Sequence, residues 1–135
     1  MKRLILAAVA LLLVIPALNA QEAKKINKKN LVIKEWNTDA ASKARILDHQ
    51  TTYNPDGKKV EEIEYGQKGQ KWRKRYEYGV DGKVSRELLY DERNKLVSVK
   101  KFEYNEFGRK KTQYTYDAKG KLKTIKVFEY LTEDA

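Results

Sequence analysis

Hydrophobic and polar residues alternate along most of the chain, after an N-terminal apolar run of a different kind. From Trp72 to Tyr130 the large apolar residues fall repeatedly on even-numbered positions. A period of two is that of a β-strand, whose successive side chains point to opposite faces of a sheet. No segment beyond the N-terminal run shows the 3.6-residue apolar period of an amphipathic helix. The pattern therefore predicts an all-β fold.

The N-terminal run has the three parts of a secretory signal peptide. Two basic residues precede the continuously apolar stretch Leu4–Val14, and a proline and small residues lead to Ala20. A transmembrane anchor is the alternative, but the run ends at Leu18 and is shorter than the about 20 residues that a span needs. We therefore expect a signal helix over residues 1–20, cleavage after Ala20, and a periplasmic or secreted protein without a transmembrane anchor.

The rest of the chain divides into a leader and one domain. Residues 21–30 are polar and rich in lysine, so we expect a flexible basic leader there. Residues 31–135 have the length of a single domain. The sequence contains no cysteine, which excludes disulfides, thiolate metal sites and a lipidated cysteine.

A tyrosine-centred motif repeats through this domain about every 12 to 14 residues, in a double unit of about 25. The pattern Tyr-(Asn/Asp/Gly)-x-x-(Gly/Asn) occurs six times, as YNPDG, YGQKG, YGVDG, YDERN, YNEFG and YDAKG. Asn or Asp at the first turn position can accept backbone hydrogen bonds, and the last position must tolerate positive φ, which glycine does freely and asparagine nearly so. We therefore expect type I turns closed by a G1 bulge, which make three-residue hairpin loops.

Strand partners follow from this loop, because it pairs positions that differ by an even number. The expected partners are Tyr78 with Val84, Tyr90 with Leu96, and Tyr116 with Leu122. Parity would then place all the large even-numbered residues on one aromatic face. The odd step between Tyr65 and Tyr78 breaks this parity, so we expect a β-bulge between Gly66 and Trp72.

A weaker copy of the unit precedes Tyr53. Leu31–Trp36 is typical of a strand, Asp39–Lys43 occupies the turn with Ser42 at the glycine position, and Ala44–Tyr53 is the next strand. We therefore expect an antiparallel meander of about eight strands, built from β-hairpin repeats, as an open curled sheet. A closed barrel is the alternative, because closure would bury the aromatic face and remove the edges.

The copies of Tyr-(Asp/Asn)-x-x-Gly followed by a strand ending in tyrosine resemble the YD (Rhs-type) repeats of bacterial surface and secreted proteins. They are also similar to short exported YD-like proteins of Bacteroidota, whose function is uncharacterised. The resemblance covers Asp39–Tyr130 and implies a β-hairpin architecture. In the long Rhs proteins such repeats build a shell around a toxin, and this chain is too short to enclose one.

The charged and nucleophilic residues give little support for catalysis. His49 is the only histidine, and the recurring Glu-Tyr strand endings resemble cross-strand charge pairs rather than a unique catalytic pair. No metal-binding or phosphate-binding motif is present. We therefore expect a protein that is not an enzyme and that uses no metal or cofactor.

Aromatic and basic residues remain as candidates for binding. Rows of Tyr and Trp on a sheet can stack on sugar rings while neighbouring Lys and Arg hold anionic groups. The candidates lie where the sequence departs from its repeat: Trp72, Arg73, Arg75, Tyr76, Tyr114 and Tyr116. The alternative is that these residues form the cross-strand ladder of the hairpins.

The net charge of +10 at pH 7 favours an anionic partner, although lysine and arginine also solvate exposed sheet edges. We expect a structural or interaction module at the cell envelope, with carbohydrate or anionic-polymer binding as the alternative. Its partners would be envelope polysaccharide or another protein, rather than nucleic acid.

Overall fold

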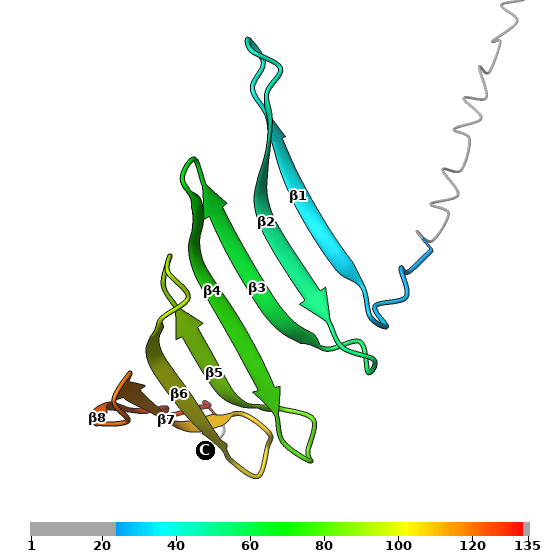
Figure 1. The fold of residues 1–135 in the computed structure, drawn as a ribbon. Helices are drawn as coiled ribbons and strands as arrows, with labels where there is room; N and C mark the ends of the chain where they lie inside the picture. The colour runs from blue at the N-terminus through cyan, green and yellow to red at the C-terminus, as the bar shows by residue number, and fades with distance from the viewer. Residues whose placement is uncertain (1–23, 134–135) are drawn as a thin grey trace, which may run out of the picture.

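The computed structural model describes residues 24–133, so the predicted signal peptide lies outside the described residues. Within this range the chain forms one antiparallel sheet of eight strands in sequence order (Figure 1). The strands are β1 (Val32–Thr38), β2 (Arg45–Tyr53), β3 (Lys59–Gly66), β4 (Gly69–Tyr78), β5 (Val84–Tyr90), β6 (Leu96–Tyr104), β7 (Lys110–Asp117) and β8 (Leu122–Val127). The predicted eight-stranded meander is confirmed. The sheet is open, with β1 and β8 as its two edges, so the alternative of a closed barrel is wrong.

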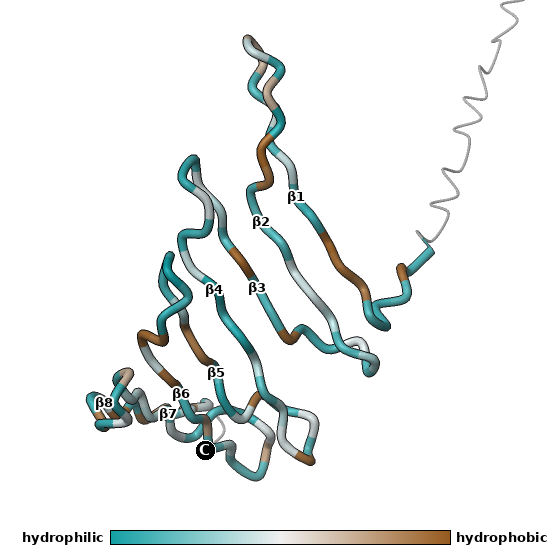
Figure 2. The backbone as a smooth tube through the Cα atoms, viewed as in Figure 1, coloured by the Kyte–Doolittle hydropathy of each residue, from teal (hydrophilic) through white to brown (hydrophobic). Residues whose placement is uncertain are grey.

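The sheet has a single layer. No helix occurs among residues 24–133, and correspondingly none that could cross a membrane. Ile63, 8% exposed, is the one buried hydrophobic residue of this range, and the hydroxyl-bearing Thr51 and Thr112 are the buried polar ones. Figure 2 shows short apolar stretches scattered along the strands instead of a continuous interior. Because no second layer buries either face, contacts within the sheet must supply most of its stability.

Five of the six repeated motifs form the predicted loop. In each, the first turn residue donates its N–H to the carbonyl of the fifth and accepts from the N–H of the fourth. The residues with positive φ are Gly57, Gly82, Asn94, Gly108 and Gly120. The side chains of Asn54, Asp91, Asn105 and Asp117 each accept two further backbone N–H groups. These bonds, from Lys95 and Arg93, lower the pKa of Asp91 below its usual 3.8.

Two turns differ from the prediction. The YGQKG motif closes a two-residue loop, with Gly66 opposite Gly69, instead of a three-residue loop. The first turn is one residue longer than expected, and Lys43, at φ 61°, takes the left-handed conformation that we assigned to Ser42. The bulge expected between Gly66 and Trp72 is confirmed, because Lys71 has no partner on β3.

The three predicted partner pairs beside the turns are confirmed, but the single aromatic face is wrong. Each three-residue loop is followed by a second bulge, which lies three residues after the residue with positive φ. The unpaired residues there are Val60, Ser85, Val97, Lys111 and Lys123. One extra residue exchanges the faces of every later side chain on that strand relative to its neighbour.

The register therefore divides the aromatic residues between two faces. Directly opposed residues share a face, and a row of such pairs runs Tyr76–Glu87–Lys100–Thr115. Tyr114 and Tyr116 flank Thr115 on β7 and so point to the other side. We call the side of Trp72 and Tyr76 the Trp72 face, and the side of Tyr114 and Tyr116 the Tyr114 face.

Tyrosines connect neighbouring strands at the end of the sheet that holds the β2–β3, β4–β5 and β6–β7 turns, which we call the tyrosine end. The Tyr78 hydroxyl donates to the Lys59 carbonyl at 2.5 Å. Tyr104 donates to Val84 at 2.7 Å, and Tyr130 donates to Lys110 at 2.7 Å. The repeat thus ties the end of each even-numbered strand from β4 onward to the start of the preceding strand.

A basic residue from the preceding turn covers each of these tyrosine rings. Lys58 Nζ lies 5.2 Å from the Tyr78 ring centroid, and Lys83 Nζ lies 5.2 Å from that of Tyr104. Lys58 Nζ also donates to the Gly82 carbonyl at 2.6 Å. A cation–π contact therefore links each of these turns to the tyrosine beside the next turn, and a hydrogen bond also joins the β2–β3 turn to the β4–β5 turn.

Replacing Gly82 by alanine should destabilise the protein more than replacing Gly120. Both residues have positive φ, which costs an L-residue about 1–2 kcal/mol. A Cβ at Gly82 would also meet Lys58 Nζ, whereas a Cβ at Gly120 meets nothing within 4 Å. We expect Gly82→Ala to lose about 1 kcal/mol more than Gly120→Ala in urea unfolding, because the lysine bond is displaced. Equal losses would show that the turn-to-turn contact contributes nothing.

Candidate functional site

The six candidate residues do not form one site. Trp72 and Tyr76 lie on the Trp72 face, and the other four, Arg73, Arg75, Tyr114 and Tyr116, lie on the Tyr114 face. Sequence parity could not show this division, because the second bulges have no glycine or other distinctive residue to mark them.

The Tyr114 face carries two rows of side chains between β4 and β8. One row runs Arg86–Lys101–Tyr114–Ile125, and the other runs Arg75–Leu88–Val99–Tyr116. We call these eight residues the Tyr114 patch. Lys101 Nζ lies 5.3 Å from the Tyr116 ring centroid, and Ile125 is 56% exposed. The patch thus combines two aromatic rings with aliphatic and basic side chains.

A shallow groove of about 250 Å³ lies along one end of the Tyr114 patch. Its lining residues are Arg86, Leu96, Val99, Lys101, Tyr116, Asp117, Ala118 and Gly120. The groove is open to solvent, so it could hold part of an extended ligand but could not enclose a small molecule.

The basic residues of the Tyr114 face differ in how far they are neutralised. Arg73 contacts Glu61 at 3.1 Å and covers the Tyr90 ring at 4.3 Å, so it is a structural residue. Arg75 is 54% exposed and reaches Glu61 only at 4.0 Å. Arg75 is therefore the more available of the two guanidinium groups for a ligand.

Arg86 and Lys101 are directly opposite each other on β5 and β6. Arg86 binds both carboxylate oxygens of Glu77, at 2.7 and 3.1 Å. No carboxylate among the described residues lies within ion-pair distance of Lys101. Glu77 compensates the charge of Arg86, so Lys101 is the cation of this pair that a further anion would neutralise.

On the Trp72 face the polar groups around Trp72 are engaged with one another. His49 Nδ1 lies 2.6 Å from Glu64 Oε2, and the His49 ring meets the Trp72 ring edge-on at 6.1 Å. Lys74 Nζ lies 5.0 Å from the Trp72 centroid and 3.6 Å from Glu87. These contacts position Trp72 as part of a cross-strand network.

Glu62 is held within the same network. It accepts a hydrogen bond from the Tyr76 hydroxyl at 3.1 Å and contacts Lys59. Burial opposes its ionisation, but the hydrogen bond and charge of Lys59 outweigh burial and lower the pKa of Glu62. Burial and the nearby Glu62 raise the pKa of Tyr76. An ionised carboxylate fixed between a lysine and a tyrosine is a structural ion pair, and it is poorly suited to accept protons near neutral pH.

The described part of the chain has no arrangement of side chains suited to bind a metal ion. No group of three or more His, Cys, Asp or Glu side chains is placed there to hold an ion.

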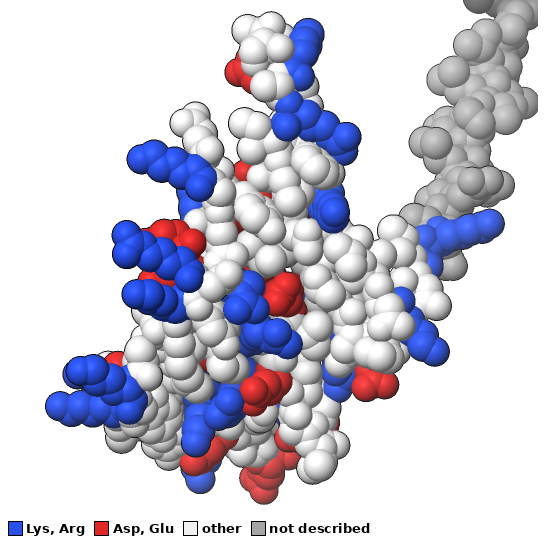
Figure 3. Space-filling view, in the orientation of Figure 1, with Lys and Arg blue, Asp and Glu red and all other residues white. Residues whose placement is uncertain are grey.

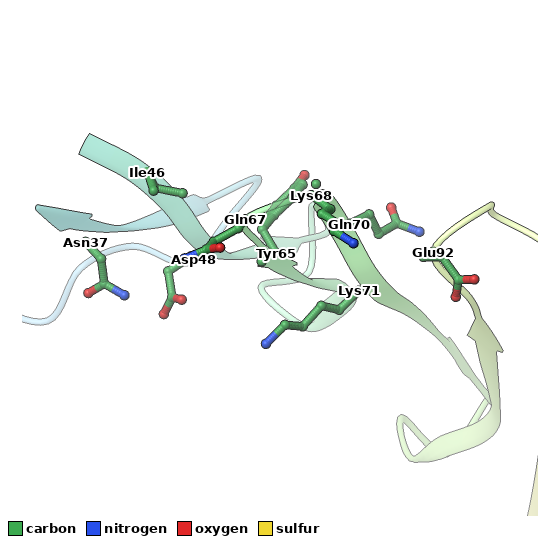
Figure 4. Close-up of a pocket in the computed structure, with 11 residues that line it drawn as sticks. Asn37, Ile46, Asp48, Tyr65, Gln67, Lys68, Gln70, Lys71 and Glu92 are labelled. Atoms are coloured by element: carbon green, nitrogen blue, oxygen red, sulfur yellow. The ribbon is translucent and has the colours of Figure 1, made fainter. Parts of the chain in front are cut away.

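A larger groove lies at the end of the sheet opposite the tyrosine end, and sequence reasoning missed it. It has a volume of about 690 Å³ and lies between the β1–β2 hairpin and the β3–β4 turn. Asn37, Asp48 and Lys71 extend to the same side of the ribbon there, and Glu92 stands at its far end (Figure 4). Its lining is mixed in charge and wide open, so it defines no ligand chemistry.

Charges of both signs are interleaved over the view in Figure 3. The high net charge is therefore spread along strands and turns, and no single-sign patch dominates that view. Recognition of an anion must depend on particular residues such as Lys101.

No protein-family model matches the chain, and no curated protein matches it. Among solved structures, a crystal structure of TarM is similar at 16% identity with a TM-score of 0.36. A mutant of S. aureus TarM in complex with fondaparinux, alpha-GlcNAc-glycerol and UDP is similar at 15% identity with a TM-score of 0.36. Each alignment covers 70% of this chain and 21% of the TarM chain. Likeness at this level carries no argument about fold or function.

Replacing either of two glutamates by glutamine should distinguish the two faces in a titration of the tyrosines. A hydrogen bond to Glu103 raises the pKa of Tyr114, whereas burial and Glu62 raise that of Tyr76. Glu103→Gln should lower the pKa of Tyr114 towards its usual 10.0 and leave Tyr76 unchanged. Glu62→Gln should lower the pKa of Tyr76, only in part because burial remains, and leave Tyr114 unchanged. NMR titration of ring-labelled tyrosine measures both, and a shift of both residues in either variant would contradict the assigned faces.

Proposed function

We propose that the protein is a non-catalytic interaction module of the cell envelope, exported to the periplasm or secreted. The single-layer sheet is the observation that carries this proposal. An enzyme site needs groups enclosed in a water-excluding cavity, and the grooves described above are open. A one-layer sheet instead offers two broad faces of rigid strands to a partner.

The Tyr114 face is the better candidate for the binding surface. Its hydrophobic side chains on β8 remain uncovered by residues 24–133, with Leu122 42%, Ile125 56% and Val127 68% exposed. Apolar residues exposed together on one face mark interaction surfaces. The polar groups around Trp72 and Tyr76, by contrast, are engaged with one another and leave less to offer a partner.

Export is supported by the sequence alone. The basic start, apolar run and small residues before Gln21 have the form of a cleavable signal. The absence of cysteine removes lipid attachment through that residue, so retention at the envelope would depend on non-covalent contacts.

Co-sedimentation with isolated envelope fragments tests this proposal. We expect the exported chain to pellet with the fragments and Tyr114→Ala to weaken its binding about tenfold, since a stacked aromatic contributes about 1–3 kcal/mol. Trp72→Ala removes an aromatic of the other face and should bind within about twofold of wild type. Circular dichroism checks the fold of both variants. Equal binding of all three proteins would exclude the Tyr114 face, and no pelleting would reject the envelope role.

Binding of an anionic polysaccharide is the second candidate. Lys101, directly opposite Arg86, favours it, because a further anion would neutralise its charge, whereas Glu77 already compensates Arg86. Tyr114 lies opposite Lys101 on β7, and Tyr116 follows about 7 Å further along that strand. Sugar rings stacked on the tyrosines would bring their acidic groups to Lys101 and Arg75.

Heparin, used as a model polyanion, tests this candidate with a pair of neighbouring lysines. Lys100 and Lys101 are consecutive on β6 but lie on opposite faces. Lys101→Gln and Lys100→Gln remove the same charge, so only a site on the Tyr114 face distinguishes them. We expect Lys101→Gln to raise the dissociation constant about tenfold and Lys100→Gln about twofold or less, measured at fixed salt. Equal effects would mean non-specific attraction and would reject the site.

A further inference from the structure

Each of the two edge strands is paired on one side only, β1 with β2 and β8 with β7, and its outer edge has no partner among the described residues. Every residue of β1 and of β8 is exposed. Unpaired edges carry free N–H and C=O groups that can template another strand. The edges also expose large hydrophobic residues, such as Trp36 on β1 and Val127 on β8.

The chain before β1 forms a turn that shares a side-chain bond and a residue with positive φ with the repeat turns, although its backbone bond runs from the Leu31 N–H to the Lys28 carbonyl. Asn27 Oδ1 accepts the Lys29 N–H at 2.9 Å, and Asn30 has a φ of 54°. The spacing Asn-x-x-Asn matches the turn from Asp91 to Asn94. Asn30 N–H also donates to the Asn54 carbonyl at 3.0 Å, so this turn lies beside the β2–β3 turn. The leader predicted over residues 21–30 thus ends in an ordered turn, at the tyrosine end.

At the C-terminal end, the described repeat reaches its tyrosine but not a further turn and strand. Tyr130 follows β8 and makes the same bond as Tyr78 and Tyr104, donating to a carbonyl on the preceding strand. Arg109 covers its ring at 5.9 Å, as Lys83 covers Tyr104. In every other copy a turn and a new strand follow this tyrosine. Within residues 24–133 the repeat therefore begins with a turn and a strand, and it ends with a strand and a tyrosine.

We propose that β8 of one molecule pairs with β1 of a second copy, so that the meander continues from chain to chain. The β6–β7 pair fixes the register, because Tyr104 lies opposite Lys110, two residues after the residue with positive φ. The same rule places Tyr130 opposite Val32 of the second copy. The interface is the strand-to-strand contact already present seven times in the sheet.

Two pairs of side chains that this register opposes are complementary. Counting on from the β6–β7 pairs, Glu129 meets Lys34 of the second copy, and Val127 meets Trp36. Opposite charges directly across a pair stabilise it, as do aromatic–aliphatic pairs. Val127 and Trp36 both belong to the Tyr114 face of their own molecule, so that face continues across the junction. A head-to-tail contact of this kind does not close on a two-fold axis and generates open chains.

Charge exchange tests the junction in the chain purified after export. Sedimentation velocity should show species that grow with concentration. Glu129→Lys and Lys34→Glu should each weaken association at least about tenfold, because each puts like charges across the junction. A one-to-one mixture of the two variants, and the double variant, should assemble again. Glu106→Lys makes the same charge change in the exposed β6–β7 turn and should assemble as wild type does.

Three outcomes would overturn this proposal. A monomer at every concentration would exclude assembly, unchanged assembly in both single variants would place the contact elsewhere, and failure of the mixture would exclude the stated register. The result is independent of the proposed envelope function, because Tyr114→Ala alters a face and not an edge. That variant should assemble normally even where it no longer binds envelope fragments.

Discussion

The bond between a tyrosine hydroxyl and a backbone carbonyl of the neighbouring strand is the interaction on which this sheet depends. A sheet without a second layer cannot gain the stability of a buried core, and one hydrophobic residue, Ile63, counts as buried in the described chain. Each Tyr–carbonyl bond holds a large ring beside the preceding strand and satisfies a polar group at the same time. The Tyr78 and Tyr104 hydroxyls are protonated donors at neutral pH, and burial raises the pKa of both further above its usual 10.0. The covering lysines then join successive turns, so the rigidity missing from a core is supplied along one end of the sheet.

The parts of the fold that could be predicted are those encoded by local chemistry. A side chain that accepts two backbone N–H groups, as Asn54 does, and a residue with positive φ three positions later define a turn by themselves. The strand partners beside each turn follow directly, as Tyr78 and Val84 show. The YGQKG turn differed because Gly66 and Gly69 allow a tighter loop, which the spacing of the motif alone could not distinguish.

The candidate site could be predicted only as a set of residue types. Its division between faces depends on bulges at positions such as Ser85 and Lys111. Neither serine nor lysine is characteristic of a bulge, so the sequence does not mark these positions. A bulge needs only one residue without a partner, so parity counting misses it and then assigns every following side chain to the wrong face. The structure brings Tyr114 and Tyr116 together with Lys101 and separates them from Trp72. Parity counting would place the odd-numbered Lys101 on the face opposite Tyr114, whereas the register places the two residues directly across from each other.

A single-layer meander of this kind also has no internal feature that limits its number of strands. Each strand contacts only its neighbours in sequence, so the repeat behaves as a one-dimensional array in which every boundary is alike. Closure into a barrel or capping by a helix would end such an array, and residues 24–133 provide neither. The side chains of β1 and β8 must therefore determine whether a further strand can pair at either edge. Lysines at an edge usually oppose pairing, yet Lys34 would face a glutamate in the register that the repeat imposes. The same charge that protects β1 from unrelated strands would thus select β8 of another copy.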